Sequence, residues 1–180
     1  MFKRTICILY IISIMSLCGC SRIEDVTEQI DSMIDNNGLF TATFNENLSQ
    51  GDTNVKLDLS SVEQGYIAIS ANSDKRLKLQ VTKDEDVYTY DVDSSGIPSI
   101  FPLQCGNGTY SFRLLENVEE SSYASIYFTE TDVNLIDEFQ PYIRPNDYVN
   151  YTESSACIQK ANELAQGAEN ETDIIIKVFN

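Results

Sequence analysis

The fold is decided by residues 77–91, which read LKLQVTKDEDVYTYD. Apolar residues occupy every second position from Leu77 to Val81, and polar residues stand between them. A period of two predicts a strand with one buried and one solvated face. The acidic triplet at 84–86 then precedes a second strand over residues 87–91, so we expect an antiparallel hairpin.

The same alternation recurs along the middle of the chain and predicts strands at residues 55–59, 110–114 and 123–133. Asn107-Gly108 is typical of a two-residue hairpin turn, because both residues tolerate positive φ. Pro98 and Pro102 cannot donate to a ladder, so residues 97–103 are expected at a sheet edge. Roughly seven or eight strands at this spacing favour an antiparallel β-sandwich of the immunoglobulin-like kind, with a small barrel as the alternative.

Aromatic rows follow from the same period. Tyr88 and Tyr90 should share one face of their strand. The last strand should place Ala124, Ile126 and Phe128 on one face, and Tyr123 with Tyr127 on the other. Such rows can stack on sugars, which would suit a cell-wall binder. Strand propensity also explains the tyrosines, so cross-strand packing is the favoured interpretation.

The amino-terminal residues have the order of a secretion signal. Lys3 and Arg4 precede an apolar run over residues 6–17, which is too short to cross a bilayer as a helix. The run closes on LCGC, which resembles a bacterial lipobox, and cleavage before Cys20 would leave that cysteine as the lipid-bearing first residue outside the cytoplasm. An ordinary signal peptide with a chance cysteine is the alternative. Cys18 departs from the pattern, since the lipobox usually has another small residue there.

Helical spacing flanks the strands on both sides. Residues 21–36 predict a short amphipathic spacer helix, and residues 138–145, with two prolines, predict an extended linker. Two short C-terminal helices should follow, capped by Thr152 and by Asn170, with Gly167 as the stop of the first. The second helix is so apolar that we expect it to need burial, either as the start of an incomplete domain or docked on the sandwich.

The charge balance excludes one class of partner. The formal net charge is −16, with 12 basic and 28 acidic residues. Since Lys3 and Arg4 would leave with the signal, the mature chain carries 10 basic residues against 28 acidic ones, a net charge of −18. Such a surface repels nucleic-acid phosphates, so we expect no nucleic-acid partner and a membrane contact made only through the lipid on Cys20.

No histidine is present in the sequence. Its absence removes the Cys-His and Ser-His dyads that activate most hydrolytic nucleophiles, as well as the commonest zinc ligand. Cys7 and Cys18 would leave with the signal and Cys20 would carry lipid, so only Cys105 and Cys157 would remain, either paired or as free thiols. We predict no catalytic residue, no metal site and no cofactor, and Cys20 as the lipidation site.

Acidic turns provide the remaining candidates for a metal site. Residues 91–96, DVDSSG, match the opening of a calcium loop, but Pro102 stands at its twelfth position where the motif has glutamate. A solvated turn is the favoured interpretation. The acidic residues at 84–86 and 119–120 are expected to be solvated loop tips as well.

Four short motifs together resemble one family: FPLQ at 101–104, GNGTY at 106–110, ENV at 116–118 and RPNDYV at 144–149. They resemble the front part of transglutaminase-like lipoproteins of Firmicutes, in which a lipid-anchored β domain precedes a papain-like catalytic core. The resemblance implies that residues 160–164 and 172–179 lead into such a core. It assigns no catalytic residue here, and Cys157 is expected to be a small buried residue of its helix.

We therefore expect a signal peptide over 1–19, a lipid-anchored spacer helix over 20–38, a β-sandwich over 39–140, and a linker with two helices over 141–180 that begins an incomplete transglutaminase-like domain. The expected function is that of a membrane-anchored extracytoplasmic lipoprotein, whose sandwich binds or positions a transglutaminase-like domain at the cell surface and is not catalytic in this form. The alternative is a complete binding lipoprotein that recognises a wall glycan or a protein partner.

Overall fold

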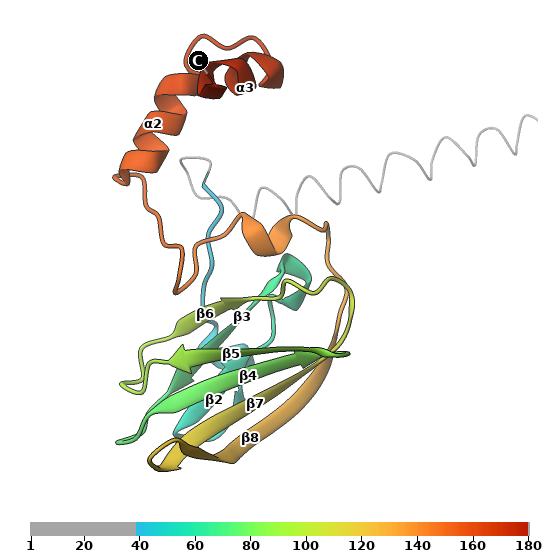
Figure 1. Cartoon of the computed structure of the whole chain (residues 1–180), viewed down its shortest axis with the longest axis vertical. Helices are drawn as coiled ribbons and strands as arrows, with labels where there is room; N and C mark the ends of the chain where they lie inside the picture. The colour runs from blue at the N-terminus through green and yellow to red at the C-terminus, as the bar shows by residue number, and fades with distance from the viewer. Residues whose placement is uncertain (1–38, 180) are drawn as a thin grey trace, which may run out of the picture. The chain divides into compact units, whose positions relative to one another are not determined.

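The computed structural model describes residues 39–179. Two four-stranded antiparallel sheets pack together, and two short helices follow near the C-terminus (Figure 1). The predicted signal peptide, the spacer helix and Cys20 lie outside the described residues. The strands are β1 (Gln50–Gly51), β2 (Val55–Asp58), β3 (Tyr66–Ala71), β4 (Leu77–Lys83), β5 (Asp86–Val92), β6 (Ser99–Pro102), β7 (Gly108–Glu119) and β8 (Ser122–Val133).

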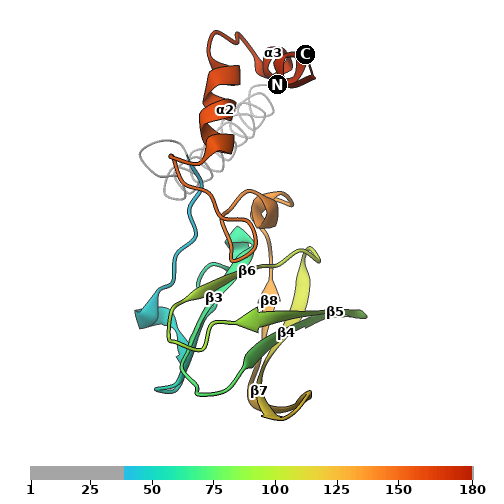
Figure 2. The same cartoon turned by 60° about the vertical axis from the view of Figure 1, so that its left-hand side comes forward.

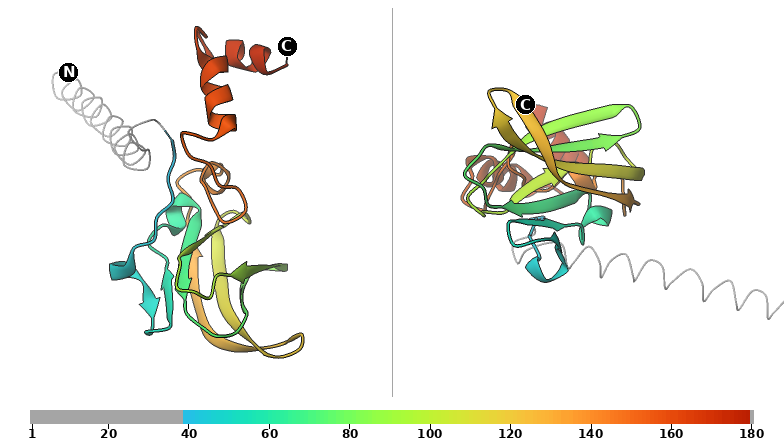
Figure 3. Two further views of the ribbon diagram at one scale, coloured as in Figure 1. Left: turned by 90° about the vertical axis from the view of Figure 1, so that its left-hand side faces the viewer. Right: turned by 90° about the horizontal axis from the view of Figure 1, so that it is seen from below.

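The strand order is β1-β2-β3-β6 in one sheet and β5-β4-β7-β8 in the other. The chain therefore crosses between the sheets after β3, after β5 and after β6, and the two layers are seen from the side in Figure 3. The inner faces bury a continuous apolar core that removes this surface from water. Its most deeply buried members are Leu57, Ile67, Ile69, Leu79, Phe101, Leu103, Tyr110, Phe112 and Leu114.

The predicted hairpin at residues 77–91 is confirmed. β4 pairs with β5 in a continuous register from Leu77–Val92 to Lys83–Asp86. Along β4 the buried positions alternate with partly exposed ones, as a period of two requires. The turn falls on Asp84-Glu85, where Asp84 adopts φ 53°, a conformation that aspartate tolerates better than most residues.

The predicted hairpin at Asn107-Gly108 is wrong. β6 pairs with β3 in one sheet, whereas β7 pairs with β4 and β8 in the other, so this loop crosses the sandwich. Asn107 instead accepts a hydrogen bond at Oδ1 from the Leu135 backbone N–H, at 2.8 Å. Asn107-Gly108 does lie in a loop, as predicted. The loop joins two sheets and not a hairpin, because β6 pairs with β3 while β7 pairs with β4 and β8.

A β-bulge overturns the predicted faces of the last strand. Between β7 and β8 the register shifts at Leu114/Leu115, so Ala124 pairs with Glu116 while Phe128 pairs with Arg113. Arg113 and Glu116 are an odd number of residues apart, which puts Ala124 and Phe128 on opposite faces. The same shift separates two further residues that were expected together, Tyr123 and Tyr127.

Asp58 departs from the alternation predicted for residues 55–59. Its position should be solvated, yet its exposed fraction is 2%. The carboxylate accepts hydrogen bonds from the backbone N–H groups of Asn45 at 2.6 Å and Ser60 at 2.9 Å. The segment before β2 therefore covers this carboxylate and satisfies it, which a period of two along one strand does not reveal.

Tyr110 ties the crossing loop to the start of β7. Its ring is fully buried, and its hydroxyl donates to the Gly106 carbonyl and accepts from the Cys105 N–H, each at 2.9 Å. Burial raises the pKa of this phenol, so it remains protonated as the donor. One side chain thus satisfies two backbone groups of a loop that has no ladder of its own.

Replacing Tyr110 with phenylalanine should lower the free energy of unfolding by about 1–3 kcal/mol, because two backbone groups lose their partner while the ring stays in place. Urea denaturation measures the change. Tyr88→Phe is the matched control, since Tyr88 is 39% exposed and lies outside the buried core. Equal effects of the two substitutions would contradict the role given to the Tyr110 hydroxyl.

The two C-terminal helices are α2 (Ala156–Ala165) and α3 (Glu171–Phe179). Gly167, with φ 71°, follows the end of α2 as predicted, and Asn170 caps α3 by accepting from the Asp173 N–H at 3.1 Å. The prediction of Thr152 as the first cap is wrong, because Ser155 occupies the N-cap.

Two further sequence expectations for the C-terminal part are wrong. Cys157 is exposed on α2, so it is not a buried helix residue. Residues 138–145 do not form an extended linker, because they contain the 3₁₀ helix η3 (Gln140–Tyr142). Gln140 and Pro141 of this helix are buried, which indicates that the segment packs rather than hangs free.

Candidate functional site

The cysteine and acidic candidates do not form a site within the described residues. Cys105 and Cys157 are both free thiols. In the turn at 91–96, the Asp93 carboxylate accepts hydrogen bonds from the Ser95 hydroxyl and from the Ser95 N–H, the latter at 2.7 Å, and these bonds lower the pKa of Asp93. Across residues 39–179 no group of three or more Cys, Asp or Glu side chains could hold a metal ion.

β5 and β6 are edge strands of the two sheets, and their ribbons can be followed in Figures 1 and 2. Residues of both strands line an aromatic groove. Its volume is about 400 Å³. We call it the tyrosine groove, after three of its lining residues. The lining residues are Tyr88, Thr89, Tyr90, Pro102, Gln104, Asn146, Tyr148 and Val149.

The rings of the tyrosine groove form a connected set. Tyr88 and Tyr90 share a face of β5, as predicted, with nearly parallel rings whose centroids are 6.5 Å apart. Tyr90 stacks on the buried Phe101 ring at 4.9 Å and meets Tyr148 at 5.7 Å. The half-buried Tyr90 therefore links the core to two exposed rings, and offset stacking of this kind fixes ring orientation.

Tyr148 reaches the groove from a tight turn beyond the strands. Asn146 closes that turn, because its side-chain oxygen accepts from the Tyr148 N–H at 2.9 Å and the Val149 N–H at 3.0 Å. Asp147 attaches the turn to the edge strand β6, where it accepts from the Ile100 N–H at 2.8 Å. These bonds hold Tyr148 in place without a neighbouring strand, by the side-chain turn chemistry of Asn and Asp.

Arg144 attaches the same segment to the residues around Gln64 and Gln140. Its exposed fraction is only 3%, and its guanidinium lies 5.6 Å from the centre of the Tyr66 ring. Nε donates to the Gln64 carbonyl at 3.1 Å, and Nη2 donates to Gln140 Oε1 at 2.8 Å. Burial lowers the pKa of Arg144, but an arginine side chain still keeps its charge. The RPNDYV motif therefore attaches the turn that carries Tyr148 to the sandwich and stabilises this side of the groove.

The tyrosine groove is electrically neutral. None of its lining residues is charged at neutral pH. The Cys105 side chain raises the pKa of Tyr88, and burial raises that of Tyr90, so both phenols remain protonated. The chain has a net charge of −16, but the residues that line this groove carry none of it. A neutral ligand can therefore bind there without contacting a charged side chain.

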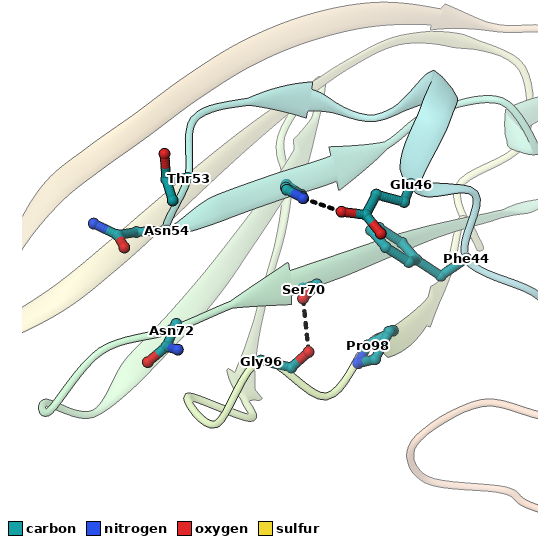
Figure 4. A pocket seen from close by; sticks show the side chains of 9 residues that line it. Phe44, Glu46, Thr53, Asn54, Ser70, Asn72, Gly96 and Pro98 are labelled. Carbon is teal, nitrogen blue, oxygen red and sulfur yellow. Dashed lines mark hydrogen bonds and ion pairs between the residues drawn. The ribbon is translucent and has the colours of Figure 1, made fainter.

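A second, polar hollow of about 340 Å³ lies beside β2 and β3 (Figure 4). An ion pair between Glu46 and Lys56 crosses it, and hydrogen bonding from Lys56 lowers the pKa of Glu46. The Ser70 hydroxyl donates to the Gly96 carbonyl at 2.8 Å. Because Glu46 and Lys56 pair with each other and the Ser70 hydroxyl is bonded to the Gly96 carbonyl, this hollow is the weaker candidate.

Sequence reasoning found only part of the groove. The alternation of β5 indicated Tyr88 and Tyr90, but nothing local to Tyr148 indicated that it would join them. The available signal was the RPNDYV motif, whose Asn and Asp are typical turn residues.

No family model matches the chain, and no curated protein matches it either. Within the described part of the chain, neither helix is both long and apolar enough to cross a membrane.

Proposed function

We propose that the protein is a lipoprotein of the extracytoplasmic membrane face, anchored by a lipid on Cys20, whose β-sandwich binds or positions another component at the cell surface. The order of Lys3-Arg4, the apolar run at 6–17 and the closing Gly19-Cys20 supports the anchor. The single observation that carries the binding role is the tyrosine groove, whose two exposed rings are Tyr88 on strand β5 and Tyr148 on a hydrogen-bonded turn.

The strand order supports the finer, immunoglobulin-like description of the sandwich. Leaving aside the short β1, it places β2, β3 and β6 in one sheet and β5, β4, β7 and β8 in the other, with repeated crossings between them. A buried tyrosine near the start of the penultimate strand, hydrogen-bonded to backbone a few residues upstream, is a hallmark of such sandwiches, and Tyr110 has this arrangement.

Binding is favoured over catalysis for this chain. A thiol nucleophile of the papain-like kind needs a base, commonly histidine, and the sequence has none. The resemblance to transglutaminase-like lipoproteins supports a positioning role, in which the sandwich holds a transglutaminase-like domain at the surface. The segment from Gln140 to Val149 packs on the sandwich and is compatible with that role. Such packing would fix the direction in which the chain leaves the sandwich. Recognition of a wall glycan is the second candidate, and the tyrosine groove favours it.

The proposed location predicts that the protein is open to the outside of intact cells. Protease added to intact, wall-stripped bacteria that express the chain should digest it, while a cytoplasmic marker protein stays whole. Immunoblotting of both proteins over time measures this. Digestion only after the cells are lysed would contradict an extracytoplasmic position.

A further inference from the structure

We propose that the tyrosine groove binds a neutral glycan strand, with sugar rings stacked on Tyr88 and Tyr148 and hydroxyl or N-acetyl groups hydrogen-bonded by Gln104 and Asn146. This inference names the ligand class for the proposed binding role and rests on it. The groove lies on the sandwich edge formed by β5 and β6, so an extended polymer can lie along it without entering the core.

The two outer rings offer surface that the protein does not cover. Tyr88 is 39% exposed and Tyr148 is 61% exposed. Both meet Tyr90, which is backed in turn by the fully buried Phe101. Tyrosine pairs a large apolar face with a polar tip, and it loses little rotamer freedom on binding. The C–H faces of pyranose rings are the natural partners of such a surface.

The groove is largely formed before any ligand arrives. The turn that carries Tyr148 is closed by Asn146 and attached to β6 by Asp147, so the distance between Tyr148 and β5 is set by hydrogen bonds to backbone. Ordering a loop on binding costs free energy, and a preformed groove avoids that cost. Exposed tyrosines on a loop without these hydrogen bonds would have to be ordered when the ligand binds.

The polar groups of the groove match hydroxyls better than ions. Gln104 is exposed, and an amide supplies both a donor and an acceptor, which is the pairing that a sugar hydroxyl or N-acetyl group needs. Ligand sites of this size combine apolar walls with a few polar groups that fix orientation. A nucleobase would also stack on tyrosine, but the phosphates that accompany it are repelled by a chain of net charge −16.

A quaternary ammonium group is a poorer match for the same rings. Aromatic cages attract cations through the ring faces, commonly together with a nearby carboxylate. The lining of the tyrosine groove contains no carboxylate. A proline-rich peptide, which also docks in aromatic grooves, is the remaining competitor and becomes an outcome of the test.

Titration of the full-length chain in detergent micelles with N-acetylglucosamine tetrasaccharide tests the proposal. The sequence has no tryptophan, so the emission that is followed comes from its 10 tyrosines, of which Tyr88, Tyr90 and Tyr148 line the groove. Saturable binding is expected. Tyr148→Ala should weaken it by about tenfold, the loss of one stacking contact, and Tyr88→Ala should act similarly.

Three controls keep the result decisive. Tyr148→Phe keeps the ring and should retain most of the affinity, and Phe128→Ala removes an exposed ring outside the groove and should bind like the parent protein. A Pro-rich peptide titrated in the same way should not bind. Absence of saturable glycan binding, equal binding by Tyr148→Ala and the parent, or peptide binding in its place would overturn the proposal. None of these outcomes depends on where the protein resides in the cell, so failure here and failure of the surface location are distinguishable.

Discussion

Replacing Arg144 with alanine is expected to lower the free energy of unfolding by about 2–4 kcal/mol, since a buried charged donor is lost and its acceptors stay behind. The guanidinium is 3% exposed and donates to the Gln64 carbonyl and to Gln140 Oε1. Without it, the Gln64 carbonyl and the Gln140 side chain lose these hydrogen bonds, and the Tyr66 ring loses the cation above it. Urea denaturation followed by circular dichroism measures the change.

Arg113→Ala is the matched control for this experiment. Arg113 also lies over an aromatic ring, Phe128, at 5.6 Å, but it is exposed on the outer face of the sheet. Its removal should change the free energy of unfolding by no more than about 0.5 kcal/mol. If Arg144→Ala changed the free energy of unfolding as little as Arg113→Ala, the segment carrying Tyr148 would not belong to the cooperative unit of the sandwich. Arg144 would then not stabilise the groove.

Replacing Cys20 with serine is expected to abolish lipid attachment completely and to release the protein from the membrane. A serine hydroxyl does not replace the thiol that carries the lipid. After loss of the signal the chain has a net charge of −18, which an anionic membrane repels. Incorporation of a labelled fatty acid, together with separation of membrane and soluble fractions, measures both effects.

Cys18→Ser is the control for that substitution, because it changes a cysteine only two residues away in the same motif. It should leave labelling and membrane association intact. Labelled protein from Cys20→Ser cells, or loss of label from Cys18→Ser cells alone, would assign the lipid to a different residue and remove the basis of the proposed anchor.

The sandwich was predictable because short stretches of sequence indicate its strands and one of its turns. The alternation at residues 77–83 and 108–115 reports which side chains are buried, and the acidic turn at Asp84 reports where the chain reverses. β6 was correctly placed at an edge, because Pro98 and Pro102 cannot serve a central ladder.

The errors came from contacts that no local pattern contains. The bulge in β8 reverses the faces of Ala124 and Phe128 because pairing with β7 sets the register, and the sequence of β8 alone does not. Asp58 looks like a solvated residue until the segment at Asn45 covers it. Tyr148 joins the groove only because Arg144 and Asp147 attach its turn to the sandwich.

Mass spectrometry of the amino-terminal peptide from the membrane fraction tests the central claim most directly. A peptide that begins at Cys20 and carries a diacylglycerol group on its sulfur is the predicted result. Its attachment would establish that the sandwich and its groove are held at the outer surface of the membrane. A peptide that retains residues before Cys20, or one that begins elsewhere with an unmodified Cys20, would contradict the account.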